Sequence, residues 1–192
     1  MSDPDDVGVA GSPGDPSYSA DPGDPGDPGD PDNVARIVCL RLLDRRAYTR
    51  AELSSALRKR GVPDESAQRV LDRFAELGLI DDAALADGYA LAQHRERGLA
   101  GRAVAMKLRQ RGIDEEAVRT AVGQIDRDSE VAAATALVQR RLRSLRELPE
   151  PVQARRLVGL LARKGYPPGL AHEVVRDALR ALGTQIEDFP TD

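Results

Sequence analysis

The side chains that most often carry catalysis or bind metals are sparse in this sequence. Its two histidines, His94 and His172, are 78 residues apart, and no cysteine or further histidine stands at ligand spacing from either. Both occupy polar positions of predicted helices, beside Arg95 and Glu173, so we expect both to be exposed. The sequence therefore predicts no catalytic, metal or cofactor site and favours a binding protein over an enzyme.

The remaining reactive side chains have structural explanations. The acidic groups at 81–82 and 114–116 stand where helices are predicted to begin, and carboxylates are stabilised there by the positive end of the helix dipole. The single cysteine, Cys39, lies in the apolar run IVCLRLL. We expect it to be a small core side chain rather than a reactive thiol.

The basic residues give a stronger functional signal. Residues 93–112 contain six basic side chains and one acidic one, and residues 139–164 contain eight basic and two acidic. Such runs fit a solvated helix face as well as a binding surface. Arg102 and Arg155, however, each stand ten residues before the glycine that ends a predicted helix, so stacked repeats would align their charges on one surface. The candidate partner-binding residues are Arg95, Arg97, Arg102, Lys107, Arg109, Arg155 and Arg156.

These basic helices belong to a repeated unit. Residues 57–74 recur at 108–125 and, more loosely, at 161–179, with glycines at Gly61, Gly112 and Gly165. A leucine precedes each glycine by four residues, and another aliphatic residue precedes that leucine by four. This spacing is typical of a short amphipathic helix that ends at a glycine in the left-handed conformation. A period of 51 and then 53 residues predicts a tandem array of helical units.

Each unit is predicted to hold three helices. Thr49 and Glu52 match a capping box that begins the second helix, and Pro63 with Asp64 begins the third. Leu79 and Ile80 are expected to pack across the junction with the next unit. We expect an all-α fold of three tandem three-helix repeats, at 34–80, 81–127 and 128–183, followed by a C-terminal tail at 184–192. The chain has two Phe and no Trp, so aliphatic side chains must fill the cores.

Residues 1–33 differ from the rest of the chain. They contain nine Asp, no Lys, Arg or Glu, and the run PGDPGDPGDP, which is typical of a disordered tail. The chain as a whole has a net charge of −4, so the body without this tail carries 28 basic and 23 acidic residues. We expect the tail to be a solubilising extension. The alternative is a regulatory arm that competes with an acidic ligand for binding to the basic body. No run approaches the roughly 18 apolar residues of a membrane span, so a cytoplasmic protein is expected.

Three stretches in this order resemble the RecX family of bacterial regulators of the recombinase RecA. They are RRAYTRAELSSALRKRGVPDESAQRVLDRFAELGLIDDAALADGYA, GLAGRAVAMKLRQRGIDEEAVRTAV and LLARKGYPPGLAHEVV, and the resemblance covers about residues 34–182. Leu85 stands where the family usually has Phe, and the proline-rich leader is extra. The resemblance implies an elongated, curved monomer in the groove of the RecA filament on single-stranded DNA. It would restrain filament growth, ATP hydrolysis, strand exchange and coprotease activity in DNA repair and the SOS response.

Two other classes of function remain open from the residues alone. One is a helical module that binds nucleic acid directly, without RecA, whose affinity would fall steeply with salt. The other is an enzyme with a site between the repeats, against which the absence of paired polar groups argues. Weak direct contact with DNA is also compatible with RecA binding.

Overall fold

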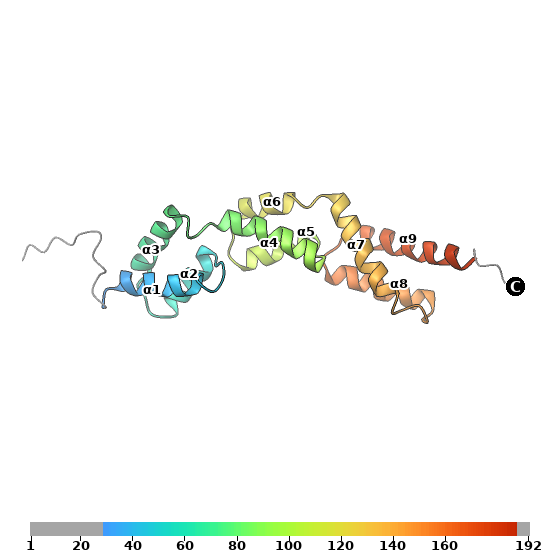
Figure 1. Cartoon of the computed structure of the whole chain (residues 1–192), viewed down its shortest axis with the longest axis horizontal. Coiled ribbons are helices and arrows are strands. Elements are labelled where there is room, and N and C mark those ends of the chain that lie inside the picture. Colours follow the sequence, from blue (N-terminus) through green and yellow to red (C-terminus); the bar gives the residue numbers. More distant parts are fainter. Residues whose placement is uncertain (1–28, 188–192) are drawn as a thin grey trace, which may run out of the picture.

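A computed structural model of the chain describes residues 29–187, with side chains to residue 183, and this part is entirely helical apart from turns and loops. Its nine helices form three successive triplets that lie in a row, so the protein is elongated (Figure 1). This arrangement confirms the predicted all-α fold of three three-helix repeats. The helices are α1 (Pro31–Leu43), α2 (Arg50–Arg58), α3 (Asp64–Glu76), α4 (Asp82–Arg97), α5 (Gly101–Gln110), α6 (Glu115–Gly123), α7 (Arg127–Leu142), α8 (Glu150–Arg163) and α9 (Pro168–Glu187).

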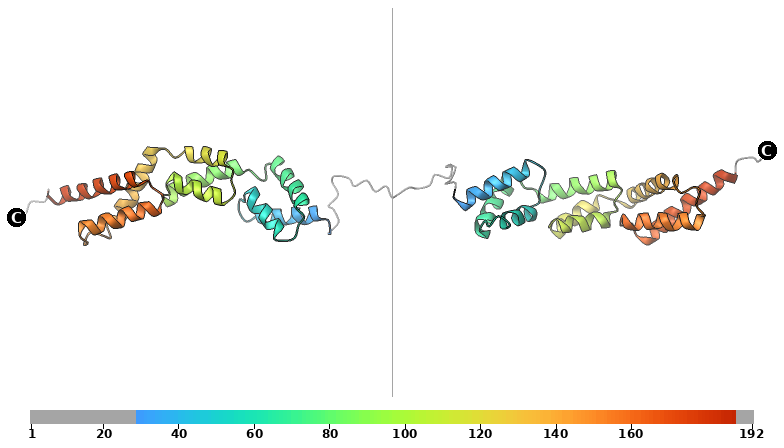
Figure 2. Two further views of the ribbon diagram at one scale, coloured as in Figure 1. Left: turned by 180° about the vertical axis from the view of Figure 1, so that it is seen from behind. Right: turned by 90° about the horizontal axis from the view of Figure 1, so that it is seen from below.

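Each triplet has its own, mostly aliphatic core. The three triplets follow one another along the molecule (Figure 2). The leucines that precede the repeated glycines, Leu57, Leu108 and Leu161, are fully buried in successive cores. Cys39 is also fully buried, and burial raises the pKa of its thiol to about 11. Cys39 is therefore a core side chain, as predicted.

The helix boundaries follow the local signals in the sequence. Thr49 Oγ1 accepts a hydrogen bond from the Glu52 N–H, and Glu52 accepts one from the Thr49 N–H, both at 3.1 Å. This reciprocal pair is the predicted capping box. Gly61, Gly112 and Gly165 have φ angles of +76°, +78° and +89°, the left-handed conformation that favours glycine at a helix end.

Two expected boundaries are wrong. Helix α1 begins at Pro31 rather than at Val34, because proline is tolerated in the first helical turn and the Asp30 side chain caps it by accepting from the Asp32 N–H. At the other end, α9 continues to Glu187, past the expected end at Gly183. Residues 31–33 of the expected disordered tail therefore belong to α1, and residues 29–30 directly precede that helix. Residues 1–28 lie outside the described residues.

The expected apolar junction between the first two repeats is also incorrect. Ile80 is buried, but in the core of the first repeat, and Leu79 is 46% exposed. The contacts between these repeats are instead a close approach of Gly112 to Ala51 and hydrogen bonds among polar groups of residues 47–52, Asp82 and Arg111. None of the helices between residues 29 and 187 is long and apolar enough to cross a membrane.

A candidate arginine-lined interface

The junction of the second and third repeats fixes α5 against the end of α8. The Ala100 N–H donates to the Lys164 carbonyl at 3.0 Å, and Lys164 Nζ donates to the Arg97 carbonyl at 2.6 Å. A Cβ on Gly165 would lie 2.6 Å from the Cβ of Ala103. The two backbones are therefore so close that only glycine fits at position 165. Gly165 thus both follows the end of α8 in the left-handed conformation and lies in the contact between the two repeats.

A cleft of about 550 Å³ opens at this junction. Arg102 and Arg109 of α5 line it on one side and Arg163 of α8 on the other. The side chain of Met106, which is 55% exposed, also lines it. The cleft therefore combines guanidinium groups with an accessible, flexible apolar side chain, which can adapt to a partner surface.

A second cleft, of about 610 Å³, continues this surface along the third repeat. It is lined by Arg141 of α7 and by Arg155, Arg156 and Arg163 of α8. Because Arg163 lines both clefts, the two are adjacent and form one surface across the repeat junction. We call it the arginine face, and it comprises Arg102, Arg141, Arg155, Arg156 and Arg163.

The arginine face carries uncompensated positive charge. Over the residues that the structure describes, no carboxylate lies within ion-pair distance of any of its five guanidinium groups. Arginine donates up to five hydrogen bonds in a planar fork that matches carboxylate and phosphate oxygens. The surface is thus suited to an anionic macromolecular partner.

Arg109 differs from the other predicted residues because it already has an anionic partner. Its Nε and Nη2 donate to the two Glu115 carboxylate oxygens at 2.7 and 2.6 Å. The Arg109 hydrogen bonds lower the pKa of Glu115, so the carboxylate stays ionised and neutralises the guanidinium. Arg109 therefore lines the junction cleft without adding net charge to it.

The other three predicted residues lie outside both clefts. Arg95 and Arg97 are exposed on the last turn of α4, and Lys107 is half-buried on α5. Arg97 does lie at the junction, since its backbone carbonyl accepts the hydrogen bond from Lys164. The structure thus brings together Arg102, Arg109, Arg155 and Arg156 of the predicted set, and it adds Arg141 and Arg163.

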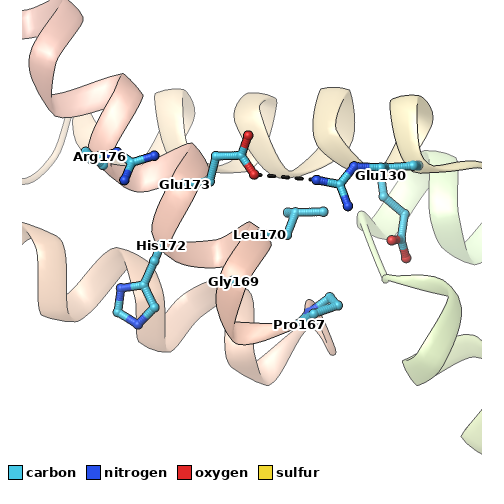
Figure 3. A pocket seen from close by; sticks show the side chains of 8 residues that line it. Glu130, Pro167, Gly169, Leu170, His172, Glu173 and Arg176 are labelled. Atoms are coloured by element: carbon cyan, nitrogen blue, oxygen red, sulfur yellow. Dashed lines mark ion pairs between the residues drawn. The ribbon is translucent and has the colours of Figure 1, made fainter.

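A third cleft, beside the junction, has mixed charge and is not part of the arginine face. Arg127 lies 3.6 Å from a carboxylate oxygen of Glu173 across this cleft, as the dashed line in Figure 3 shows. The Glu130 carboxylate, which comes from α7 like Arg127, accepts a hydrogen bond from the Gly101 N–H at 2.8 Å. Positive charge here is matched by carboxylates.

The expectation that both histidines are exposed is wrong for His94. His172 is exposed, but His94 is only 7% exposed, and its Nδ1 lies 2.9 Å from the Leu99 carbonyl. The reason is that the buried face of α4 consists of Ala86, Ala90 and His94, at steps of four residues. His94 thus fixes the loop that leads to α5. Across residues 29–187 no three His, Cys, Asp or Glu side chains are grouped to hold a metal ion.

Fold and surface together define the class of protein. Three tandem helix triplets with an arginine face across the second and third make this a helical-repeat protein with an extended cationic surface.

The chain belongs to the RecX family. Residues 35–74, 81–122 and 128–175 match the first, second and third three-helix domains of RecX. A protein from Thermobifida fusca (strain YX) named Regulatory protein RecX is 51% identical over 157 residues, which are 82% of this chain and 84% of that protein. A Streptomyces coelicolor protein of the same name is 47% identical over 153 residues, 80% of this chain and 81% of its own.

Solved structures support the fold. The crystal structure of RecX from Lactobacillus salivarius has a TM-score of 0.70 at 16% identity, covering 77% of this chain and 96% of that one. A second structure, of a regulatory protein RecX, has a TM-score of 0.68 at 24% identity and covers 77% of this chain and 72% of its own.

Proposed function

We propose that this protein inhibits RecA by binding the RecA filament on single-stranded DNA through the arginine face. Bound along the filament groove, it limits filament growth, ATP hydrolysis, strand exchange and coprotease activity. It acts in DNA repair and the SOS response, as a cytoplasmic monomer without catalytic activity or cofactor of its own. Membership of a family of regulatory proteins supports this role.

The observation that carries the proposal is the continuity of the arginine face across the repeat junction. Arg163 lines the clefts on both sides, so cationic groups of two repeats follow one another along an elongated molecule. A filament repeats its subunits along an axis, and an extended ligand can contact several of them at once. Uncompensated charge would also steer the protein toward an anionic groove.

Direct binding to nucleic acid is the second candidate, because arginines without carboxylate partners can also contact phosphates. The part of the chain that the structure describes has few aromatic side chains on which unpaired bases could stack, and Tyr166 and Phe74 are buried. We therefore expect contact with bare single-stranded DNA to be weak and to be lost steeply as salt increases.

The test is the ATPase activity of RecA on single-stranded DNA, measured over a series of concentrations of this protein. We expect inhibition at concentrations at which the protein does not bind the same DNA without RecA, as followed by anisotropy of a labelled oligonucleotide. Unchanged RecA ATPase would contradict the proposal. Inhibition that merely parallels binding to bare DNA would support the nucleic-acid module instead.

A further inference from the structure

A groove between α8 and α9 borders the second arginine cleft, because Arg155 lines both. The two helices are antiparallel neighbours in the third repeat (Figure 1). The groove has a volume of about 500 Å³, within the roughly 300–1,000 Å³ of typical ligand pockets. Its apolar lining is aliphatic: Ala154 and Val158 from α8, and Val175 and Leu179 from α9.

The spacing of these four residues gives the groove a definite length. In each helix the two lining residues are four positions apart, which corresponds to a rise of about 6 Å. Ala154, Val158 and Leu179 are only partly buried against the core below them, so their outer surfaces can still be covered. Two apolar side chains one helical turn apart on a partner helix would fit this floor.

The rim of the groove is basic. Arg155 lines it from α8, and His172, Arg176 and Arg180 line it from α9. His172 and Glu173 leave α9 in different directions, so the Glu173 carboxylate faces the neighbouring mixed-charge cleft instead of this groove (Figure 3). Glu150 is the one carboxylate among the lining residues. Asp177 lies 3.6 Å from Arg176, but both side chains are more than half exposed, so this pair is weak.

We propose that this groove docks an acidic amphipathic helix of a partner protein. Two aliphatic side chains of the partner, one turn apart, cover the floor, and carboxylates on its flanks pair with Arg155 on one side and Arg176 on the other. The floor of the groove is aliphatic, and the imidazole of His172 on the rim is the one ring among the lining residues, so apolar side chains of a helix match this groove better than the bases of a nucleic acid. This site goes beyond the proposed function, because Arg176 and the aliphatic floor are not part of the arginine face.

The experiment uses the full chain and a labelled synthetic helical peptide that carries two leucines four residues apart, flanked by glutamates. We expect saturable binding by fluorescence anisotropy. The substitution Arg176→Glu should weaken it about fivefold, and replacing the two peptide leucines by serine should weaken it about tenfold. A control with Arg41→Glu on α1 changes the same charge on an exposed residue of the first repeat and should bind the peptide as the parent does.

Several results would overturn the site. These are the absence of saturable binding, equal binding by the Arg176→Glu variant, or displacement of the acidic peptide by the same peptide with lysines in place of glutamates. Competition by a single-stranded oligonucleotide at equal strength would assign the groove to nucleic acid. RecA ATPase inhibition by the Arg176→Glu variant is measured in parallel. If this variant still inhibits RecA, a failure of the groove site is independent of the arginine face.

Discussion

Arg111 and Glu52 form a bidentate ion pair that joins the second repeat to the first. Arg111 Nε and Nη2 each lie 2.9 Å from a Glu52 carboxylate oxygen, and both side chains are less than a quarter exposed. Beside the pair, Thr49 Oγ1 donates to the Arg111 carbonyl at 2.7 Å. The capping box of α2 is thus also the attachment point for the next repeat.

This junction should weaken in acid. Burial raises the pKa of Glu52, but hydrogen bonds from Arg111, the Thr49 N–H and Arg46 outweigh it and lower the pKa to about 2. Because the folded-state pKa lies below the ordinary 4.5, the ionised carboxylate stabilises the fold fully above about pH 5, and this contribution is lost as the pH falls toward 2. At pH 7 we expect Glu52→Gln to lower the free energy of unfolding by about 2–3 kcal/mol.

Urea unfolding at pH 7 and pH 3 checks this. The difference in the free energy of unfolding between the parent and Glu52→Gln should shrink to about 1 kcal/mol at pH 3, because part of the stabilisation by the ionised carboxylate is already lost at that pH. Glu76→Gln serves as the control, because Glu76 pairs with Arg73 on the open surface with both side chains 65% exposed. An equal difference at both pH values would show that the Glu52 carboxylate does not stabilise the junction.

Alanine substitution at two of the repeated glycines, Gly61 and Gly112, distinguishes the cost of the left-handed backbone from the cost of disturbing the packing between repeats. A Cβ on Gly61 would meet nothing within 4 Å, whereas one on Gly112 would collide with the Cβ of Ala51. Gly61→Ala should therefore cost only the left-handed conformation, about 1–2 kcal/mol, and Gly112→Ala should cost more. Thermal and urea unfolding of both variants give the comparison. Equal losses would mean that the close approach of the first two repeats contributes nothing.

Truncation tests where the N-terminal tail ends. Asp30 caps α1, and Asp32 accepts hydrogen bonds from Arg69 of α3 at 2.8 and 3.0 Å. Removing residues 1–28 should change the free energy of unfolding by less than about 0.5 kcal/mol, because their Pro-, Gly- and Asp-rich sequence has little to bury. Removing 1–33 should cost about 1–3 kcal/mol, since the cap and the first turn are lost. A similar stability of both truncated proteins would contradict the Asp30 cap.

Local signals in the sequence specify most of the fold. Thr49 with Glu52 and the three glycines act over a few residues, so their positions predict the helix ends. The sequence does not reveal the burial of His94, because one residue of helical phase decides whether a side chain faces the core, and a carbonyl such as that of Leu99 can satisfy a histidine there. The polar junction between the first two repeats is not predictable from local signals, because Arg111 and Glu52 are 59 positions apart in the chain.

The arginine face was predictable only in part. Arg156 and Arg163 are seven residues apart on α8 and so share a helix face. This spacing is enough to add Arg163 to the candidate partner-binding residues. Arg141 comes from α7, and only the packing of that helix places it in the same cleft. Helical spacing likewise does not reveal that Glu115 neutralises Arg109, because α5 ends between the two residues.

The charge reversal of the arginine face tests the central claim most directly. The variant combines Arg102→Glu, Arg155→Glu and Arg163→Glu, and all three positions are exposed, so native helicity and melting are expected. The control combines Arg41→Glu, Arg45→Glu and Lys59→Glu, which are exposed in the first repeat.

The measurement is the concentration of each folded protein that halves RecA ATPase activity on single-stranded DNA. We expect the arginine-face variant to require about tenfold more protein than the parent, equivalent to roughly 1.4 kcal/mol, and the control to stay close to the parent. A folded arginine-face variant that inhibits as well as the parent would contradict the account and leave this surface as ordinary solvated helix.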